Sequence, residues 1–505
     1  MKLSKDKIGK MDKKELTRHR VKEVDRKQLK FKIVDLENVI PPGHRARLIW
    51  EFVGRQDLTK FYEDIKTVDG VAGREAWDPR MMITLWVYAI SKGINSAREI
   101  SRGCEYEPAL MWITGDRVIN HHSLSDFRVG HGEALRQLFI DILGAMSSQG
   151  LVKMKRVMQD GTKIEADASS NSFRREGTLL KHLEMAREAV KQMEENSDES
   201  IGKKTRKRRE SSAKERLRRL EKAVLELEKM RAEKDSEKEK KETRVSLSDP
   251  ESRVMREGNG GFDPCFNGQI LTDAENKIIV GVSLTQEGND IHQLENSLFE
   301  IDRNTGKKPA EMVVDSGYIS GDNIIKMSGT GIDLYGPMPD NESKGKRKSE
   351  MAPEFYSEKF TYDAAANSFT CPAGKSLRYK SQYKTGQFTY YAYLARKSDC
   401  QQCPFKSQCC PKTKSTGRTV TRKQILPEVE AFNKKMSTEE SKAIYKERSP
   451  VAEFPNLWIK EKLGLRRFRV RGLVKAGLEL LWAALTYNLQ HWIRLSGGKL
   501  SPGLS

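Results

Sequence analysis

The sequence predicts a mixed α/β core with an all-α region before it and two inserts within it. Helical periodicity dominates up to residue 150, and strand-like and helix-like runs then alternate as far as residue 340. A long helical segment interrupts this alternation and a cysteine-bearing segment follows it, so we interpret both as inserts. At roughly 150 residues per folding unit, the chain of 505 residues has room for about three such units.

The composition indicates an anionic partner. The chain has 91 Lys and Arg residues against 71 Asp and Glu residues, a formal net charge of +20. Because 37% of the residues are hydrophobic, bulk disorder is excluded. No run reaches the ~18 consecutive apolar residues of a membrane-spanning helix, and the first thirty residues lack the pattern of a secretory signal. We therefore expect a protein that stays in the cytoplasm.

The N-terminal region divides into a basic flexible arm, residues 1–30, and a helical region, residues 31–150. The arm is either a solvated terminus or an electrostatic anchor on DNA. In the helical region, Ser96 and Glu99 form a capping box, and Gly and Asp turns join short helices. This pattern favours a helix-turn-helix-like bundle that binds DNA, and the alternative is a small all-α packing domain.

The α/β core is predicted from two segments, residues 151–177 and 245–340. Its first strand is the alternating run that starts at Lys155 and contains Asp160. Another apolar strand ends in Asp315, so both aspartates lie at or near strands of one mixed sheet. Further strands are expected at Phe266–Leu271, Lys277–Leu284 and Ile332–Met338, with helices around Ile291–Ile301 and Ile324–Ile325.

The insert at residues 178–244 is predicted to be a coiled-coil hairpin. Apolar residues recur three and four apart along two helical runs, and the two runs should pair antiparallel. Between them, the segment Lys203–Arg209 (KKTRKRR) carries six basic residues around one Thr. This segment is either a solvated tip or a clamp for phosphate groups.

The second insert, residues 341–440, holds five of the seven cysteines. An odd number of cysteines in a long chain favours thiols or a metal site over a disulfide framework. Cys400-x2-Cys403, with two more cysteines in reach, suggests a tetrahedral zinc set of Cys371, Cys400, Cys403 and Cys409. Four thiolates leave no open position for water, so this Zn²⁺ would be structural. The alternative is a reduced, partly buried cluster without metal.

The two strand-associated aspartates suggest phosphoryl transfer. With two metal ions, this chemistry needs carboxylates from different elements that converge on hard cations about 3.5 to 4 Å apart. Asp160 and Asp315 could both face an open edge of the sheet. Each alone could also be an ordinary turn residue at a strand end, and Asp167, Asp290 and Asp322 are rivals for the two positions.

The segment at residues 441–495 carries the pattern that links the chain to a known family. Y-x2-R-x4-E-x6-K, which starts at Tyr445, precedes a dense basic run. This pattern resembles the Y-R-E-K signature of DDE transposases of bacterial insertion sequences. The segments QDGTKIEAD around Asp160 and DSGYIS at Asp315 resemble the first two acidic motifs of that family. The resemblance covers roughly residues 30–495.

The resemblance implies a ribonuclease-H-like core that binds two Mg²⁺ or Mn²⁺ ions through Asp160, Asp315 and Glu453. Glu447 and Glu461 are neighbours that compete with Glu453 for the third position. Such an enzyme cuts the 3′ ends of its own element and joins them to target DNA without a covalent protein intermediate.

The resemblance also assigns Tyr445, Arg448 and Lys460 to contacts with the transposon end. Glu453 and Lys460 are seven residues apart, nearly two helical turns, so they would share a helix face. Pro455 removes a backbone hydrogen bond inside a helix, which predicts that the helix starts at Pro455 and leaves Glu453 near its N-terminus.

A basic run follows this pattern, and the chain then ends in a tail, residues 496–505. Basic and apolar residues alternate in the run, whose arginines are Arg466, Arg467, Arg469 and Arg471. Such a run is usually a solvated face, but this one adjoins the proposed site, so we expect it to bind DNA phosphates in a strongly salt-dependent way.

These features predict a DNA transposase that binds the terminal inverted repeats of its insertion sequence. It would catalyse metal-dependent 3′-end cleavage and strand transfer, with double-stranded DNA of transposon ends and target as partners. Because a synapse holds two ends, we expect a homo-oligomer on DNA, associated with the nucleoid and not with a membrane. The alternatives are an inactive or nuclease-only relative, or a DNA-binding regulator that uses the N-terminal helices and the coiled coil.

Overall fold

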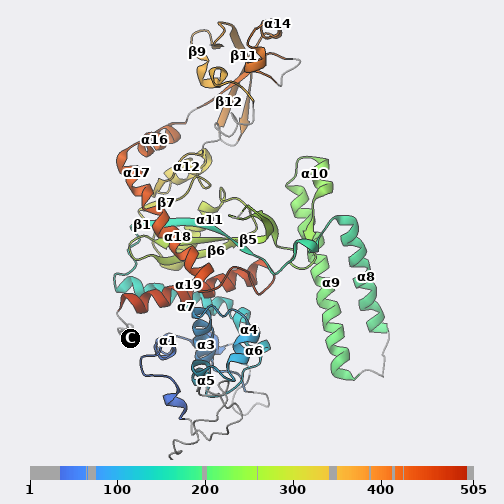
Figure 1. Ribbon diagram of the computed structural model, residues 1–505, viewed down its shortest axis with the longest axis vertical. Helices are drawn as coiled ribbons and strands as arrows, with labels where there is room; N and C mark the ends of the chain where they lie inside the picture. The colour runs from blue at the N-terminus through green and yellow to red at the C-terminus, as the bar shows by residue number, and fades with distance from the viewer. Residues whose placement is uncertain are drawn as a thin grey trace, which may run out of the picture.

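The computed structural model describes residues 35–63, 65, 67, 75–195, 202–258, 260–339, 350–385, 388–411, 416–424 and 426–496. The predicted basic arm, residues 1–30, and residues 497–505 of the predicted tail lie outside this part of the chain. Figure 1 shows a central sheet flanked by helices, a helical bundle below it, a paired-helix arm at its side and a second sheet above it. Within the described residues, no helix is long and apolar enough to cross a membrane.

The central sheet contains six strands among the described residues, and the predicted mixed α/β architecture is confirmed. In its middle lies β1 (Arg156–Glu165), antiparallel to β5 (Phe262–Asp273) and parallel to β7 (Glu311–Val313). The strand order is β4-β5-β1-β7-β8, and β6 pairs with the part of β5 that follows the β4 pairing. The remaining strands are β4 (Arg253–Arg256), β6 (Ile278–Thr285) and β8 (Asp333–Tyr335).

The two faces of this sheet pack against different helices. Val157 of β1 joins the large core that includes the helices below the sheet, whereas Met158 packs with Ile444 and Val451 on the opposite face. Because side chains alternate along a strand, Asp160 lies on the same face as Met158. The helices concerned are α11 (Gln293–Thr305) and α19 (Leu473–Leu495) on the first face, and α17 (Glu439–Lys446) and α18 (Arg448–Leu457) on the second.

The N-terminal helices share the core of the sheet. Helix α3 (Pro79–Ser91) is buried along nearly its whole length and packs against α19. The predicted capping box is confirmed, because the Ser96 hydroxyl accepts a hydrogen bond from the Glu99 amide at the start of α4. The other elements are η3 (Leu36–Val39), α1 (Arg45–Val53), α2 (Thr59–Glu63), α4 (Ala97–Gly103), α5 (Pro108–Thr114), α6 (His121–Gly130) and α7 (Gly132–Ser148).

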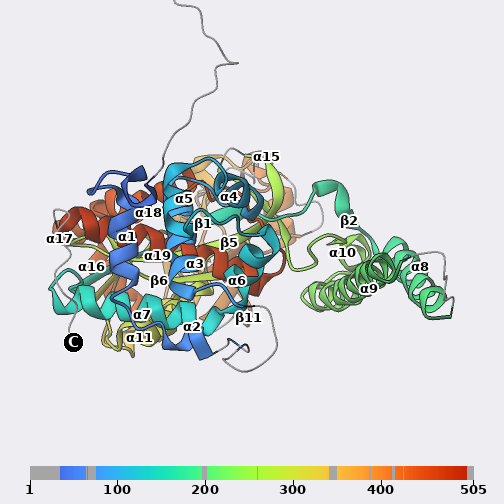
Figure 2. The ribbon, with the colours of Figure 1, turned by 90° about the horizontal axis from the view of Figure 1, so that it is seen from below.

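A helical arm stands apart from this body, as Figures 1 and 2 show. It consists of α8 (Glu176–Glu195) and α9 (Lys203–Ala232), followed by the short α10 (Glu237–Glu242). The two long helices pack through a separate apolar cluster of Leu179, Leu183, Ala186, Leu220, Ala223 and Leu227. At the root of the arm, β2 (Phe173–Arg174) pairs antiparallel with β3 (Val245–Ser246).

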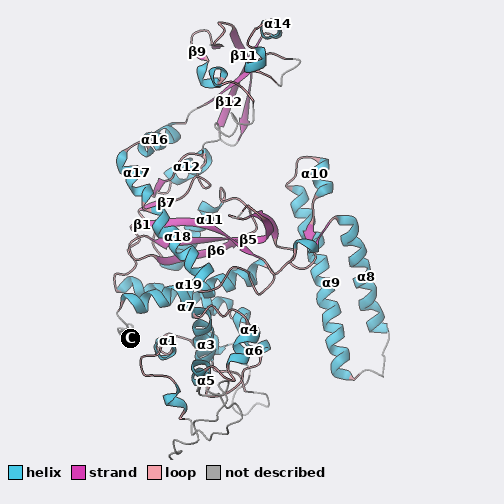
Figure 3. Ribbon diagram, viewed as in Figure 1, coloured by secondary structure: helices cyan, strands magenta, loops and turns pink. Residues whose placement is uncertain are grey.

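The cysteine-bearing insert contains a second sheet that the sequence did not predict. Its strands pair in the order β13-β12-β11-β10-β9, all antiparallel, around a core that includes Leu377 and Tyr393 (Figure 3). Two short helices, α14 (Lys397–Gln401) and α15 (Lys406–Cys409), carry Cys400 and Cys409. The strands are β9 (Thr361–Asp363), β10 (Ser368–Thr370), β11 (Ser376–Thr385), β12 (Phe388–Ala395) and β13 (Thr419–Lys423).

One prediction about the C-terminal segment is wrong. Helix α18 does not start at Pro455 but at Arg448, and Pro455 lies inside it. Val451, Ala452 and Pro455 are buried on one face of the helix, and this packing offsets the hydrogen bond that the proline lacks. Beyond the proline, the chain continues as a π-helical turn, η7 (Trp458–Lys462).

Candidate active site

Asp160 is the best-enclosed of the predicted carboxylates. Two side chains of α18 hold it: Arg448 Nη1 donates to Oδ1 at 3.3 Å, and Asn456 Nδ2 donates to Oδ2 at 2.7 Å. Burial raises the pKa of Asp160, Arg448 opposes this rise, and the charge of Asp315 adds to it. Asp315 is therefore near enough to interact with Asp160, in a place where carboxylate charge is costly.

The sheet register explains why the two aspartates meet. Met158 of β1 is paired in parallel with Val313 of β7, and each aspartate lies two residues beyond this pair. β7 ends at Val313 whereas β1 continues to Glu165, so Asp315 follows the end of β7 beside the middle of β1, where Asp160 lies. Asp315 Oδ1 accepts a hydrogen bond from the Gly317 amide at 2.7 Å. Although burial opposes it, both carboxylates raise the pKa of Arg448.

Asp290, which the sequence indicated only as a rival for the first two carboxylate positions, lies against β1. Its Oδ1 accepts hydrogen bonds from the side-chain amides of Asn267 and Gln269, both at 2.7 Å. A Cβ added to Gly161 would lie 2.6 Å from this oxygen, so only glycine at that position admits Asp290. A Cβ added to Gly317 would lie 2.9 Å from Asp315 Oδ1 and 3.9 Å from Asp290 Oδ2.

The Tyr318 hydroxyl lies among all three aspartates. It is fully buried and donates to Gln269 Oε1 at 2.6 Å. Burial first, and then the charges of Asp290, Asp160 and Asp315, raise its pKa well above the ordinary value. The phenol therefore stays protonated and orients the amide that holds Asp290. Sequence reasoning missed Tyr318, Gln269 and Asn456. Tyr318 lies inside the DSGYIS segment but was given no role there, and a single amide residue carries no motif.

Glu453 is not brought to the two aspartates. It lies on α18 between Arg448 and Asn456, but its side chain is exposed. No hydrogen bond or ion pair joins it to another described residue. Within the described part of the chain, no group of three or more His, Cys, Asp or Glu side chains could hold a metal ion as arranged. The geometry thus unites Asp160 and Asp315 but leaves the predicted third carboxylate apart.

The residues predicted to contact DNA lie in two environments, the inner part of the site and the exposed basic run. Tyr445 and Arg448 lie at the α17–α18 junction, where Arg448 faces Asp160. Lys460 is on the π-helical turn, and burial lowers its pKa although Glu257 and Cys265 oppose the change. These three side chains therefore line the inner part of the site.

The basic run lies beside the end of β1. Arg467 forms a parallel bridge with Glu165, and the Phe468 amide donates to the Glu165 carbonyl at 2.9 Å. Phe468 is buried while Arg466, Arg467, Arg469 and Arg471 are exposed, as the alternating pattern indicates. Three of these arginines form ion pairs, which are Arg466–Glu461, Arg467–Glu165 and Arg471–Asp167. Part of the positive charge of the run is therefore balanced.

The cysteines of the second insert gather around a small cavity of about 30 Å³. It is lined by Cys371, Cys400, Cys403 and Cys409, and also by Cys410. Backbone amides of Lys375 and Arg418 donate to the sulfurs of Cys371 and Cys400, both at 3.3 Å. All five thiols are unpaired, and burial raises the pKa of Cys409 to about 11. The predicted four residues are thus neighbours, and Cys410 joins them.

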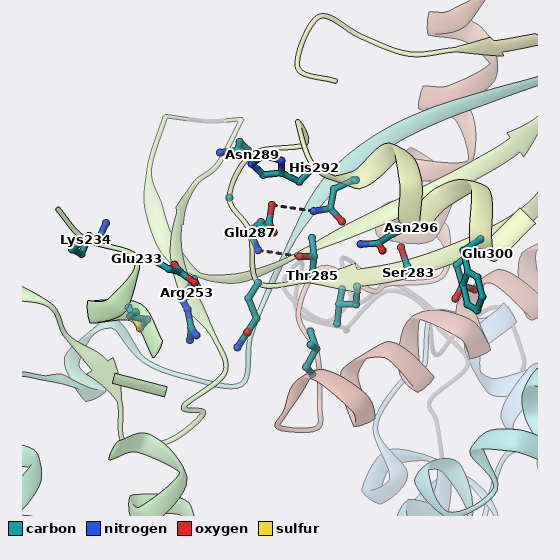
Figure 4. A pocket seen from close by; sticks show the side chains of 17 residues that line it. Glu233, Lys234, Arg253, Ser283, Thr285, Glu287, Asn289, His292, Asn296 and Glu300 are labelled. Atoms are coloured by element: carbon teal, nitrogen blue, oxygen red, sulfur yellow. Dashed lines mark hydrogen bonds between the residues drawn. The ribbon is translucent and has the colours of Figure 1, made fainter. Parts of the chain in front are cut away.

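A cavity of about 780 Å³ lies between the root of the arm and the start of α11, and its lining includes Asn289 but not Asp160, Asp290 or Asp315 (Figure 4). Glu233, Lys234 and Arg253 line one side, and Glu287 and His292 line the other. Acidic and basic groups are mixed there, so the cavity lacks the positive charge that phosphates need. Its size does not make it the candidate site.

Comparison with known proteins indicates the class of protein to which this chain is similar. A family model described as a transposase DDE domain matches residues 370–493, and one described as a transposase domain matches residues 34–130. The chain is therefore similar to transposases over these two segments, and the resemblance to DDE transposases that the sequence indicated is confirmed. Asp160 and Asp315 lie outside both matched segments, whereas Glu453 lies within the first.

The structural comparison is weaker. The solved structure of a piggyBac transposase synaptic complex with hairpin DNA aligns with 93% of this chain and 77% of that chain. The identity is 9% and the TM-score 0.32, a likeness too low to define a shared fold. No curated protein matches the chain.

Proposed function

We propose that the protein is a DNA transposase that cuts the 3′ ends of its insertion sequence and joins them to target DNA. The observation that supports this most is the proximity of Asp160 on β1 and Asp315 just after β7, next to the helix that carries the Y-R-E-K pattern. The similarity to transposase domains supports duplex DNA as the class of substrate. Because two ends must be held together, we propose that it acts as a homo-oligomer.

We also propose that the core is ribonuclease-H-like and that the arm is a coiled-coil hairpin. The central sheet supports the first proposal, since β5 and β6 are antiparallel to their neighbours while β7 and β8 run parallel to β1. The separate apolar seam of α8 and α9 supports the second.

Asp160 and Asp315 fit a divalent-cation site in part. Their paired, half-buried carboxylates suit Mg²⁺ or Mn²⁺, and Asn456 Oδ1 is buried without a hydrogen-bond partner beside them. Glu453 would complete the set proposed from the sequence. When bound, two such ions would activate the attacking oxygen and stabilise the leaving one. Arg448 and Asn456 orient Asp160, and Lys163 and Lys460 place positive charge near the site.

Strand cleavage of duplex DNA that carries the element's terminal repeats tests this proposal. With Mg²⁺, Asp160→Asn and Asp315→Asn should each lower the cleavage rate at least about a hundredfold, because each removes one ligand charge. Asp302→Asn on α11, an exposed residue, is the matched control and should cut like wild type. Full cleavage by either site variant would refute the proposed role of that residue.

The same assay decides which residue is the third carboxylate. If Glu453→Gln abolishes cutting and Asp290→Asn does not, Glu453 is the third residue, and α18 must turn it inward when metal or DNA binds. The reverse result would assign the role to Asp290. Loss in neither variant would leave a site of two aspartates and contradict the three-carboxylate proposal.

We propose in addition that Cys371, Cys400, Cys403 and Cys409 hold one structural Zn²⁺. Their common cavity and the amide-to-sulfur hydrogen bonds support this, since such bonds stabilise thiolates. Binding would draw the sulfurs closer together. Metal analysis of protein purified without chelator should give about one zinc per chain. Cys403→Ser should lose it, and Cys265→Ser, on the central sheet, should keep it.

A further inference from the structure

We propose that the end of the helical arm binds the phosphate backbone of duplex DNA, away from the aspartates. The surface, called here the arm tip, consists of Lys204, Arg206, Lys207, Arg208 and Arg209, all exposed on the first turns of α9. The identity of the partner rests on the proposed transposase function. The surface itself is defined by charge and position alone.

The charge of α9 is sharply asymmetric. Residues 203–219 contain ten basic and two acidic residues, whereas residues 220–232 contain three of each. Where surface charge serves only solubility, basic and acidic residues are mixed along a helix. The half of α9 near the root has such a mixed composition. The net charge of +8 over seventeen residues at the other end self-repels and calls for an anionic partner.

Two acidic residues near the arm tip, Glu194 and Glu210, are engaged by a lysine that does not belong to it. Lys214 forms ion pairs with Glu210 of its own helix and with Glu194 of α8. Lys214 lowers the pKa of Glu210, and the charges of Arg206 and Lys207 lower it further. No residue of the arm tip forms an ion pair with any other described residue. Its charge is therefore available to phosphates.

The arm holds this positive charge at a distance from the central sheet. Helix α9 has 30 residues, which at 1.5 Å per residue is about 45 Å, or roughly 13 base pairs of duplex. Its root is fixed, because buried Glu226 pairs with Arg253 of β4 and accepts from Gln286 at 3.1 Å. Lys222 pairs with Glu251 at 2.5 Å. A duplex at the aspartates would thus meet the arm tip only through its flanking sequence.

Binding of a duplex of about 40 base pairs, measured by fluorescence anisotropy without divalent metal, tests the arm tip separately from cleavage. In the tip variant, Arg206, Lys207 and Arg208 are all replaced by Gln. The slope of log affinity against log salt should become shallower by about 2 to 3, since each lost phosphate contact removes about 0.9. The dissociation constant at about 0.1 M salt should rise at least about tenfold.

The matched control replaces Arg187, Lys191 and Lys229 by Gln. These residues lie on the same arm and are equally exposed, but each forms an ion pair. The control loses the same net charge and should keep its affinity within about threefold. Circular dichroism and thermal melting should show both variants folded, because Gln is a good helix former.

Equal losses in the two variants would mean that only net charge matters, and no loss in the tip variant would mean that the arm tip is merely solvated. Either result overturns the proposal. Tighter binding of single-stranded RNA than of duplex DNA by wild type would overturn the choice of partner. If wild type binds as expected but never cuts DNA, the proposed transposase function fails while the arm tip stands.

Discussion

At the residue scale, Asp160 depends on partners nearly three hundred positions away. The sequence flagged Arg448, but as a contact to DNA, whereas its guanidinium faces Asp160. Asn456 was not flagged, because an Asn inside a helix has no pattern until the buried face of that helix is known. Asp160 and Asp315 could be selected from the sequence because an acidic residue within or just after an apolar strand is a local feature. Their partners are a matter of tertiary packing.

Gly161 offers a direct test of the inner site. In Gly161→Ala the new methyl group would meet Asp290 Oδ1 at 2.6 Å and Gln269 Nε2 at 3.0 Å. Two amides hold Asp290 in place, so either it or β1 must shift, at a cost of about 1 to 3 kcal/mol in the free energy of unfolding. We expect DNA cleavage to fall at least about tenfold, measured under single-turnover conditions. Wild-type cleavage would show that the position of Asp290 does not matter.

Gly144→Ala is the matched control for that substitution. Gly144 lies on an exposed position of α7, and a Cβ there meets nothing within 4 Å. The change should stabilise the helix by up to about 1 kcal/mol in the free energy of unfolding and leave cleavage unchanged.

Asp249 should make stability depend on pH. Burial raises its pKa from 3.8 to about 6, although backbone amides including that of Gly472 donate to it. The folded state therefore binds this proton more tightly than the unfolded state, so the stabilising contribution is present at low pH and is lost as the pH rises towards 6 and above. Asp249→Asn should be more stable than wild type, by about 1 kcal/mol more at pH 8 than at pH 5, in urea unfolding. A gain that is equal at both pH values would contradict this.

At the scale of elements, hydrophobic periodicity predicted the helices and strands that local sequence pattern determines. The strands that became β1, β5, β6, β7 and β8 and the paired helices of the arm were all expected. The second sheet was not, because β9 and β10 are only three residues each and β11 is exposed at every residue except Leu377, so no alternation marks it. The continuation of α18 through Pro455 was also missed, since it depends on packing against the sheet.

The contact between α6 and α19 supplies a prediction about stability. Arg128 and Glu479 pair at 3.1 Å with side chains only 4% and 2% exposed, and Glu479 also accepts from the Arg469 amide at 2.9 Å. Glu479→Ala would leave the Arg128 charge buried without a counter-ion, at a cost of about 3 to 5 kcal/mol. The double variant Arg128→Met with Glu479→Leu should recover most of this loss in urea unfolding. A double variant as unstable as the single one would show that the pair itself, not the orphaned charge, sets the cost.

At the scale of the whole molecule, the apolar cores differ from the predicted segments. The N-terminal helices and the central sheet share one core, so the region expected to be a separate DNA-binding bundle is tied to α19. The arm and the second sheet each have a core of their own. Sequence periodicity identifies which face of a helix is apolar, but it cannot identify which other element covers that face.

The arm should therefore be removable without loss of the body. Arg174 of β2 is paired with Val245 of β3, so the points where the chain enters and leaves the arm lie side by side at its root. Replacing residues 175–244 by Asn-Gly would close this pair with a two-residue hairpin turn. The apolar seam of α8 and α9 would leave with the arm, and only Val245 and Leu247 of its cluster would stay on the body, together with Arg253, the partner of Glu226. We therefore expect a monodisperse protein whose melting temperature lies within a few degrees of wild type. Calorimetry and size-exclusion chromatography would measure this, and aggregation would show that the arm stabilises the body. If the shortened protein folds, its DNA affinity should show the same shallower salt dependence as the tip variant, since both lack the same phosphate contacts.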